Sequence, residues 1–265
     1  MNDLLLSFLL GLIQGLTEFL PISSSAHLLF PSLLFGTNDL GLAFDIAVHA
    51  GTLFAVIYFF RSDILLMAKS IFISDLQSRK SNKLAQLLII ATLPIVLVGL
   101  FVSGFIESNR GNIANIAYMN LLFAGLLLIA YKYASSSKTI VELTIIGALF
   151  IGLFQVFALL PGASRSGTAI TAALFIGLNL KDSSKFAFLL AIPTILGALV
   201  FLIADLAIFQ AKINISTLII GFVTSSIVAF LTIKYFLIFV SKFSLNLFVY
   251  YRIFLSIILF ALIYI

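Results

Sequence analysis

Seven stretches of the chain are apolar over about 20 residues each, the length at which a helix crosses the hydrocarbon core of a membrane. They cover residues 43–60, 86–106, 114–133, 139–160, 186–205, 215–238 and 246–265. Only 9% of the 265 residues are charged, whereas soluble domains carry about a quarter charged residues. The pattern predicts an all-α polytopic membrane protein in which residues 1–265 form a single integral membrane domain.

Two further apolar regions are interrupted. Residues 4–36 are broken at Pro21 and the serines that follow, and residues 161–178 begin with "PGASRSG". Irregular backbone inside a membrane needs protein or water around it. We therefore expect both regions to be re-entrant helix hairpins that enter the bilayer without crossing it. The N-terminus lacks a basic region and a cleavage site, so we expect it to belong to the mature protein.

The chain also resembles itself. "GLIQGLTEFLPISSS" (11–25) parallels "GLFQVFALLPGASRS" (152–166), at an offset of about 141 residues. Duplication in membrane proteins is typical of inverted-topology repeats whose broken helices meet at the functional site. The sequence predicts two such repeats, over about residues 1–135 and 139–265.

The net charge of +5 comes from basic clusters in 61–83, 132–138 and 181–185. Such clusters mark cytoplasmic loops, so the charge does not indicate nucleic acid. Apolar residues from Ile64 to Leu76 recur at helical spacing, which predicts an amphipathic helix on the inner membrane surface. The chain has no cysteine, which excludes disulfides, thiol nucleophiles and Cys-ligated metals.

The first interruption concentrates polar groups. Gln14 and Glu18 are four residues apart and share a helical face. Pro21 ends that helix, and serines are favoured at the start of the next one. The remaining polar residues of the motif are Ser23, Ser24, Ser25 and His27.

The second interruption supplies a fixed positive charge and hydroxyls, namely Arg165 with Ser164, Ser166 and Thr168. Helix N-termini and arginine both suit phosphate. Two such breaks facing each other would form an anion cradle inside the membrane region.

A third segment, "AFDIAVHAGT", places Asp45 and His49 four residues apart. Asp45 would either fix the tautomer of His49 or neutralise Arg165. Glu, Arg and His inside a membrane are costly and functional by default. The remaining charges, Lys234 and Arg252 among them, are most simply loop or interfacial residues.

At these motifs the chain resembles the undecaprenyl-diphosphate phosphatases of the bacitracin-resistance type. The first family motif is matched by Gln14, Glu18, "FLP", the serines and His27, and the second by "PGASRSG". "FDIAVHAGT" is also similar, and the likeness covers nearly the whole chain. Gln14 stands where the family more often has Glu, which would weaken metal binding at that position.

The resemblance implies hydrolysis of the terminal phosphate of undecaprenyl diphosphate, which returns the lipid carrier to cell-wall synthesis. It also implies bacitracin resistance, a bacterial plasma-membrane location, a metal-dependent site open to the outer face, and interlocked inverted repeats. The expected partners are a polyprenyl diphosphate lipid and the bilayer. A homodimer is compatible with the sequence.

Diphosphate hydrolysis needs charge neutralisation and an activated nucleophile. We expect Arg165 and the N–H groups near Ser164 and Ser166 to bind the diphosphate. Glu18, with Gln14, would hold a divalent cation such as Mg²⁺ or Ca²⁺ or orient a water. Either Ser24 attacks phosphorus while His27 takes its proton, or water attacks with Glu18 or His27 as base; Ser24 is favoured.

Two other functions fit part of the pattern. Inverted repeats with buried charges also describe secondary transporters, and a polyprenyl-phosphate flippase is the most plausible version. A second family of membrane lipid phosphatases has a "Pro-Ser-Gly-His" motif, which this chain lacks.

Overall fold

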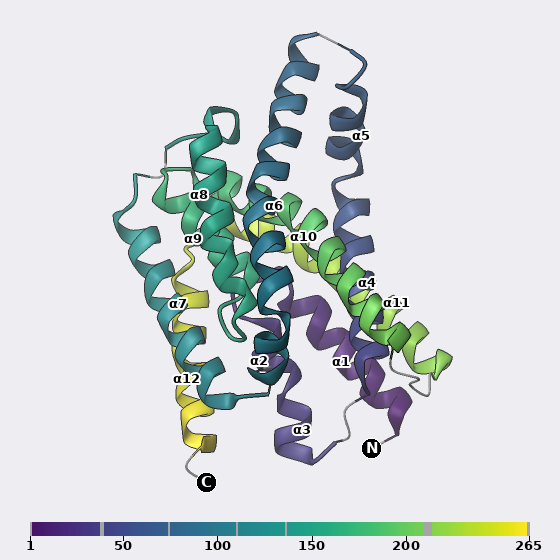
Figure 1. The fold of residues 1–265 in the computed structure, drawn as a ribbon. Helices are drawn as coiled ribbons and strands as arrows, with labels where there is room; N and C mark the ends of the chain where they lie inside the picture. Colours follow the sequence, from purple (N-terminus) through teal and green to yellow (C-terminus); the bar gives the residue numbers. More distant parts are fainter. Residues whose placement is uncertain are drawn as a thin grey trace.

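The computed structural model describes residues 2–37, 40–73, 75–109, 111–135, 137–208 and 214–263, and every secondary-structure element named in them is a helix. Figure 1 shows their arrangement. The elements are α1 (Asp3–Thr17), α2 (Ser24–Leu28), α3 (Phe30–Phe35), α4 (Leu42–Phe59), α5 (Arg61–Lys69), α6 (Leu76–Asn109), α7 (Ile113–Tyr133), η1 (Ile140–Glu142), α8 (Ile145–Gln155), η2 (Val156–Leu159), α9 (Arg165–Phe175), α10 (Leu180–Ile208), α11 (Ile215–Val240) and α12 (Asn246–Ile263).

Within the described residues, six helices are long and apolar enough to cross a membrane, namely α4, α6, α7, α10, α11 and α12. The protein is therefore a multi-pass membrane protein, as the sequence predicts. One of the seven expected spans, residues 139–160, does not form a single helix, so that prediction is wrong. Thr144 caps a new helix at Ile145, and that helix gives way to a 3₁₀ turn at Val156. The apolar run is thus divided into pieces too short to span.

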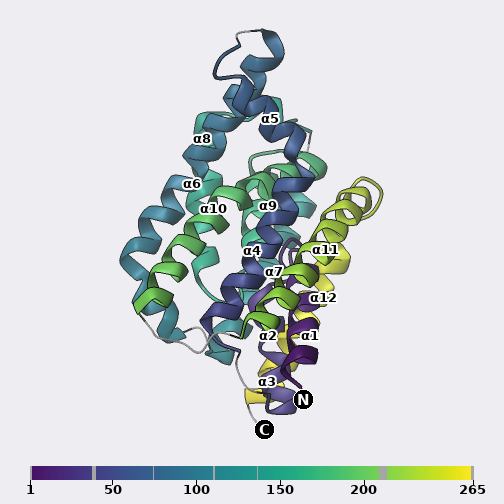
Figure 2. The ribbon, with the colours of Figure 1, turned by 90° about the vertical axis from the view of Figure 1, so that its right-hand side faces the viewer.

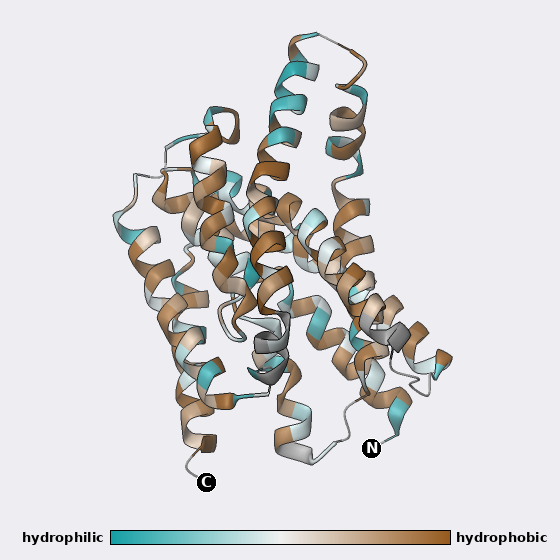
Figure 3. Ribbon diagram, in the orientation of Figure 1, coloured by the Kyte–Doolittle hydropathy of each residue, from teal (hydrophilic) through white to brown (hydrophobic). Residues whose placement is uncertain are grey.

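Apolar side chains cover much of the outside of the bundle. Phe101 is 86% exposed, Ile146 81% and Phe254 60%, and brown, hydrophobic segments follow the middle of the long helices in Figure 3. A water-soluble protein would bury such side chains. This surface is the one that lipid tails would contact.

The segment expected to be one amphipathic surface helix is divided in two. α5 ends at Lys69 and α6 begins at Leu76. α5 follows α4 and packs beside the start of α6 as a hairpin (Figure 1). The apolar residues from Ile64 to Leu76 therefore belong to two helices and the turn between them.

Glycines allow α11 to approach α1 and α4 closely (Figure 2). A Cβ built on Gly15 would lie 2.7 Å from the Val228 side chain, and one on Gly51 would overlap the Ser225 hydroxyl. Small residues at helix contacts are the usual means of tight packing in membranes. This contact fixes α1, which carries Gln14, and α4, which carries His49.

Helices from the two halves of the chain exchange partners. α1 packs on α11, and α8 packs on α6. α4 contacts both α11 and α10, α9 contacts α7 and α10, and α7 packs on α12. The residues on both sides of each interruption are consequently held by helices from the other half.

Candidate active site

The two interruptions lie against each other. Residues 18–23 join α1 to α2, and residues 160–164 join η2 to α9. The N–H of Gly162 donates to Ser25 Oγ at 3.2 Å, and Ser166 Oγ donates to the carbonyl of Leu20 at 2.9 Å. Segments about 141 residues apart in the sequence therefore form one polar centre.

Glu18 and Arg165 form an ion pair across this contact, between Oε1 and Nη2. Their side chains are only 7% and 16% exposed. Arg165 Nη1 also donates to the Ala191 carbonyl and to Thr194 Oγ1 of α10, each at 3.2 Å. The guanidinium is thus held from two sides, and the structure brings the Glu18 carboxylate and the Arg165 guanidinium into contact.

The second carboxylate oxygen of Glu18 accepts two hydrogen bonds. Gln14 Nε2 donates to Oε2 at 2.9 Å, and Ser24 Oγ donates to the same atom at 2.9 Å. A carboxylate that accepts from a serine hydroxyl is placed to take its proton. Ser24 is therefore directed at Glu18.

His27 lies on α2 beside the serines, as expected, but its hydrogen bonds differ from the expected one to Ser24. Among the described residues its hydrogen-bond partners are the carbonyl of Ser23, 2.7 Å from Nδ1, and the hydroxyl of Tyr251, 2.6 Å from Nε2. Ser24 is not one of them, because its hydroxyl donates to Glu18. The expected direct transfer of a proton from Ser24 to His27 does not fit this arrangement.

A shared backbone feature precedes each helix of the site. Ser23 has φ 71° and Ser164 has φ 70°, and they are the only two non-glycine residues with positive φ within the described ranges. Such conformations cost about 1–3 kcal/mol and persist where the surrounding contacts enforce them. Each strained serine directly precedes a central side chain, Ser24 or Arg165.

The other predicted hydroxyls mainly stabilise the two interruptions. Ser164 Oγ accepts from the N–H of Gly167 at 3.1 Å and so caps α9. Thr168 Oγ1 donates to the carbonyl of Arg165 at 2.8 Å. The hydroxyls of Ser23 and Ser25 are 3.1 Å apart, and those of Ser164 and Ser166 are 3.2 Å apart.

His49 lies near the ion pair. Glu18 and Arg165 are close enough for their charges to act on it. Its Nδ1 lies 2.8 Å from the backbone carbonyl of Asp45, which can only accept, so Nδ1 carries hydrogen. Asp45 therefore fixes the His49 ring through its backbone, and the acid paired with Arg165 is Glu18.

Arg252 was missed by the sequence reading, which placed it in a loop or at the interface. It is fully buried on α12. Its guanidinium donates to acceptors on both interruptions and on α7, namely the carbonyls of Pro21 (3.4 Å), Gly162 (3.0 Å) and Ala163 (3.0 Å) and Oδ1 of Asn120 (2.9 Å). The available signal was an arginine within the apolar run 246–265, where a charge is functional by default.

The donor set fits a hard divalent cation only in part. Glu18 provides carboxylate oxygens, and Gln14 Oε1 is buried with no hydrogen-bond partner in the described part of the chain. No group of three or more His, Cys, Asp or Glu side chains suited to a metal is found in the described ranges. This set suits a cation that takes its other ligands from phosphate oxygens, as Mg²⁺ commonly does.

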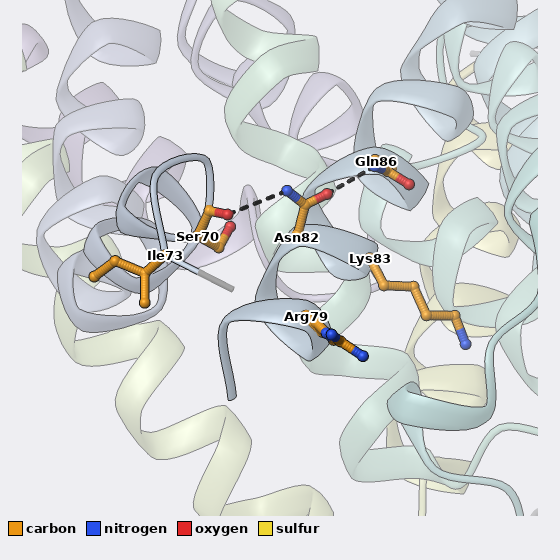
Figure 4. A pocket seen from close by; sticks show the side chains of 6 residues that line it. All are labelled: Ser70, Ile73, Arg79, Asn82, Lys83 and Gln86. Carbon is orange, nitrogen blue, oxygen red and sulfur yellow. Dashed lines mark hydrogen bonds between the residues drawn. The ribbon is translucent and has the colours of Figure 1, made fainter. Parts of the chain in front are cut away.

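A hollow of about 260 Å³ opens between α5 and the start of α6 (Figure 4). It shares no residue with the polar centre and is lined by Ser70, Ile73, Arg79, Asn82, Lys83 and Gln86. A second hollow lies beside α8 and is lined by Lys138, Glu142, Leu143, Thr144, Ile146, Gly147, Phe150, Ile176 and Leu178. Neither hollow includes a residue of the polar centre, which is defined by its hydrogen bonds and its ion pair.

Comparisons with known proteins identify the family of the chain. The profile of the family described as "Bacitracin resistance protein BacA" matches residues 7–258. A protein of Saccharophagus degradans is 43% identical over 263 residues, 99% of each chain, and one of Alcanivorax borkumensis is 42% identical over 253 residues, 95% of this chain and 96% of that one. Both relatives are named undecaprenyl-diphosphatase.

Proposed function

The chain belongs to the bacitracin resistance protein BacA family, and from that premise we propose how its polar centre removes the terminal phosphate of undecaprenyl diphosphate. The protein is an undecaprenyl-diphosphatase, a membrane hydrolase that converts the diphosphate to undecaprenyl phosphate. Bacitracin resistance fits the family name. The observation that carries the mechanism is the meeting of Ser24, Glu18 and Arg165 where the two interruptions touch.

Arg165 binds the diphosphate group. Its planar guanidinium matches two phosphate oxygens at once, and it lies at the first position of α9, where backbone N–H groups and the helix dipole also favour an anion. Binding substrate exchanges part of the Glu18–Arg165 pair for an Arg165–phosphate pair. Glu18 is then free to act as a base.

Ser24 is the nucleophile in the favoured route. Its Oγ attacks the terminal phosphorus, the bond from that phosphorus to the bridging oxygen breaks, and undecaprenyl phosphate leaves. The proton of Ser24 passes to Glu18 along their hydrogen bond. Glu18 passes this proton to the oxygen of the departing undecaprenyl phosphate and is a carboxylate again. It then takes a proton from a water that attacks the phosphoserine, returns that proton to Ser24 Oγ, and phosphate is released. In the alternative route, water attacks the substrate directly with Glu18 as base.

A divalent cation, Mg²⁺ or Ca²⁺, would be held by Glu18 and the amide oxygen of Gln14. When bound it supplies positive charge to the phosphate oxygens. Because Gln14 is neutral, the protein contributes one formal negative charge at these two positions. The affinity for the cation therefore depends strongly on the phosphates themselves.

The two halves of the chain are proposed to be interlocked inverted repeats with re-entrant hairpins. This is supported by the exchanged packing of α1 on α11 and α8 on α6, and by the positive φ of Ser23 and Ser164 at equivalent places. A plasma-membrane location with the site open to the outer face is supported by the basic residues around α5 and α6, which belong on the cytoplasmic side.

The test is metal-dependent release of phosphate from a short-chain prenyl diphosphate in detergent. The wild type is expected to release phosphate, and Glu18→Ala and Arg165→Ala are expected to lose that activity while remaining folded. Near-normal turnover in either variant would refute the assignment. If the protein only transported the lipid, neither the wild type nor any variant would release phosphate.

A further inference from the structure

Tyr251 of α12 contacts the site although it belongs to neither motif. Its hydroxyl is 2.6 Å from His27 Nε2, and the two rings are nearly parallel, with an interplanar angle of 6° and centroids 5.6 Å apart. α12 is the last helix of the chain, and α2, which carries His27, is among the first. The contact therefore joins opposite ends of the sequence at the polar centre.

The hydrogen bonds of His27 determine where its proton lies. The carbonyl of Ser23 can only accept, so Nδ1 carries the hydrogen of that 2.7 Å bond. In a neutral imidazole Nε2 is then an acceptor, and the Tyr251 hydroxyl donates to it. A second ring proton would place a cation near the buried Arg252, whose charge acts on His27. Among the described residues the ring of Phe30 also packs against His27, with centroids 6.1 Å apart, and it carries no charge.

Through His27 the Tyr251 hydroxyl reaches the backbone beside the nucleophile. The carbonyl that His27 holds belongs to Ser23, the residue with φ 71°, and Ser24 follows directly. A conformation of this kind needs external contacts to persist. His27 and Tyr251 together supply such a contact.

We propose that Tyr251 is a positioning residue for the hydrolysis: it locks His27 as a neutral strut, and this strut holds the Ser23 turn that aims Ser24 at Glu18. The inference rests on the proposed function, because it takes Ser24 and Glu18 as the reacting pair. It assigns His27 a structural task and leaves the proton transfer to Glu18.

The first experiment compares Tyr251→Phe with Tyr250→Phe in the phosphate-release assay. Tyr250 is the neighbouring tyrosine, 63% exposed, so its loss of a hydroxyl is the matched control. Tyr251→Phe is expected to lower kcat by about 10- to 100-fold with little change in KM, because small misplacements of reacting groups have effects of this size. Tyr250→Phe is expected to match the wild type.

The pH profile separates positioning from simple packing. Without the Tyr251 hydroxyl, Nε2 of His27 is open to a proton, so the variant should lose activity as the pH falls, at a pH below the ordinary range of histidine because burial and the charge of Arg252 lower the pKa of His27. The wild type should lack this step. Unchanged kcat together with an unchanged pH profile in Tyr251→Phe would overturn the proposal.

The second experiment reads the tautomer directly. The chain has two histidines, so in a His49→Gln background ¹⁵N-labelled histidine reports on His27 alone. At pH 7 the proposal expects hydrogen on Nδ1 and none on Nε2; hydrogen on Nε2 would overturn it. This measurement does not depend on turnover. Failure of the proposed function would instead appear as a wild type that releases no phosphate.

Discussion

Ser24 Oγ donates a hydrogen bond to Glu18 Oε2 at 2.9 Å across the interruption between α1 and α2. The two residues stand on opposite sides of Pro21, so the turn that ends one helix and begins the next sets the distance between them. The same carboxylate is paired with Arg165 from the other half of the chain. The proposed nucleophile, base and anion-binding group therefore depend on one local geometry.

Replacing Ser24 with alanine should reduce phosphate release by at least about a thousandfold, the scale seen when a covalent nucleophile is removed. Ser25→Ala is the matched control. Ser25 Oγ accepts the Gly162 N–H and is not bonded to Glu18, so its loss should cost less than about tenfold. Labelled phosphate should be trapped on the wild type and not on Ser24→Ala. Full activity in Ser24→Ala would exclude the covalent route and favour direct attack by water.

The Glu18–Arg165 pair should show strong coupling in stability. Removing one partner leaves an uncompensated buried charge, which typically costs about 3–5 kcal/mol, whereas replacing both by apolar residues is often neutral. Glu18→Leu and Arg165→Met should each lower the unfolding temperature in detergent, and the double variant should regain most of the loss while staying inactive. A double variant less stable than either single variant would contradict this expectation.

Gln14 should determine the concentration of divalent cation that the enzyme needs for activity. Chelation of metal should abolish phosphate release, and Mg²⁺ or Ca²⁺ should restore it. Gln14→Glu adds a negative charge and should lower the metal concentration for half-maximal activity about tenfold, whereas Gln14→Met should raise it. Gln155, the equivalent residue of the second motif, is buried with both amide atoms unpartnered in the described ranges, and Gln155→Met should leave the requirement unchanged. An identical metal dependence in all three variants would remove Gln14 from the cation site.

The interruptions could be located from the sequence because proline and serine act locally. Pro21 and "PGASRSG" mark the turns. The repeated spacing predicts that Glu18 and Arg165 lie in one site, and the structure shows them in contact. The partners of His27 could not be inferred, because Tyr251 lies 224 residues away and no local pattern records that contact.

The number of spans also depends on details that hydropathy does not carry. Residues 139–160 are as apolar as a spanning helix, but the Thr144 cap and the turn at Val156 divide them. The sequence alone assigns Arg252 to a loop or an interface. Its burial follows from carbonyls that only the folded interruptions present.

Arg252 should contribute more to stability than any exposed cation of the chain. Arg252→Met leaves the four acceptors of its guanidinium unsatisfied in a buried setting, at about 1–3 kcal/mol each, so we expect a loss of at least about 3 kcal/mol and of all activity. Arg252→Lys keeps the charge but lacks the planar fork, and should be intermediate. Lys234→Met, at an exposed position of α11, is the control and should change stability by less than about 0.5 kcal/mol. Thermal unfolding in detergent measures the stability of each variant, and the phosphate-release assay measures its activity. Equal stability of Arg252→Met and Lys234→Met would show that the two interruptions hold each other without the buried guanidinium.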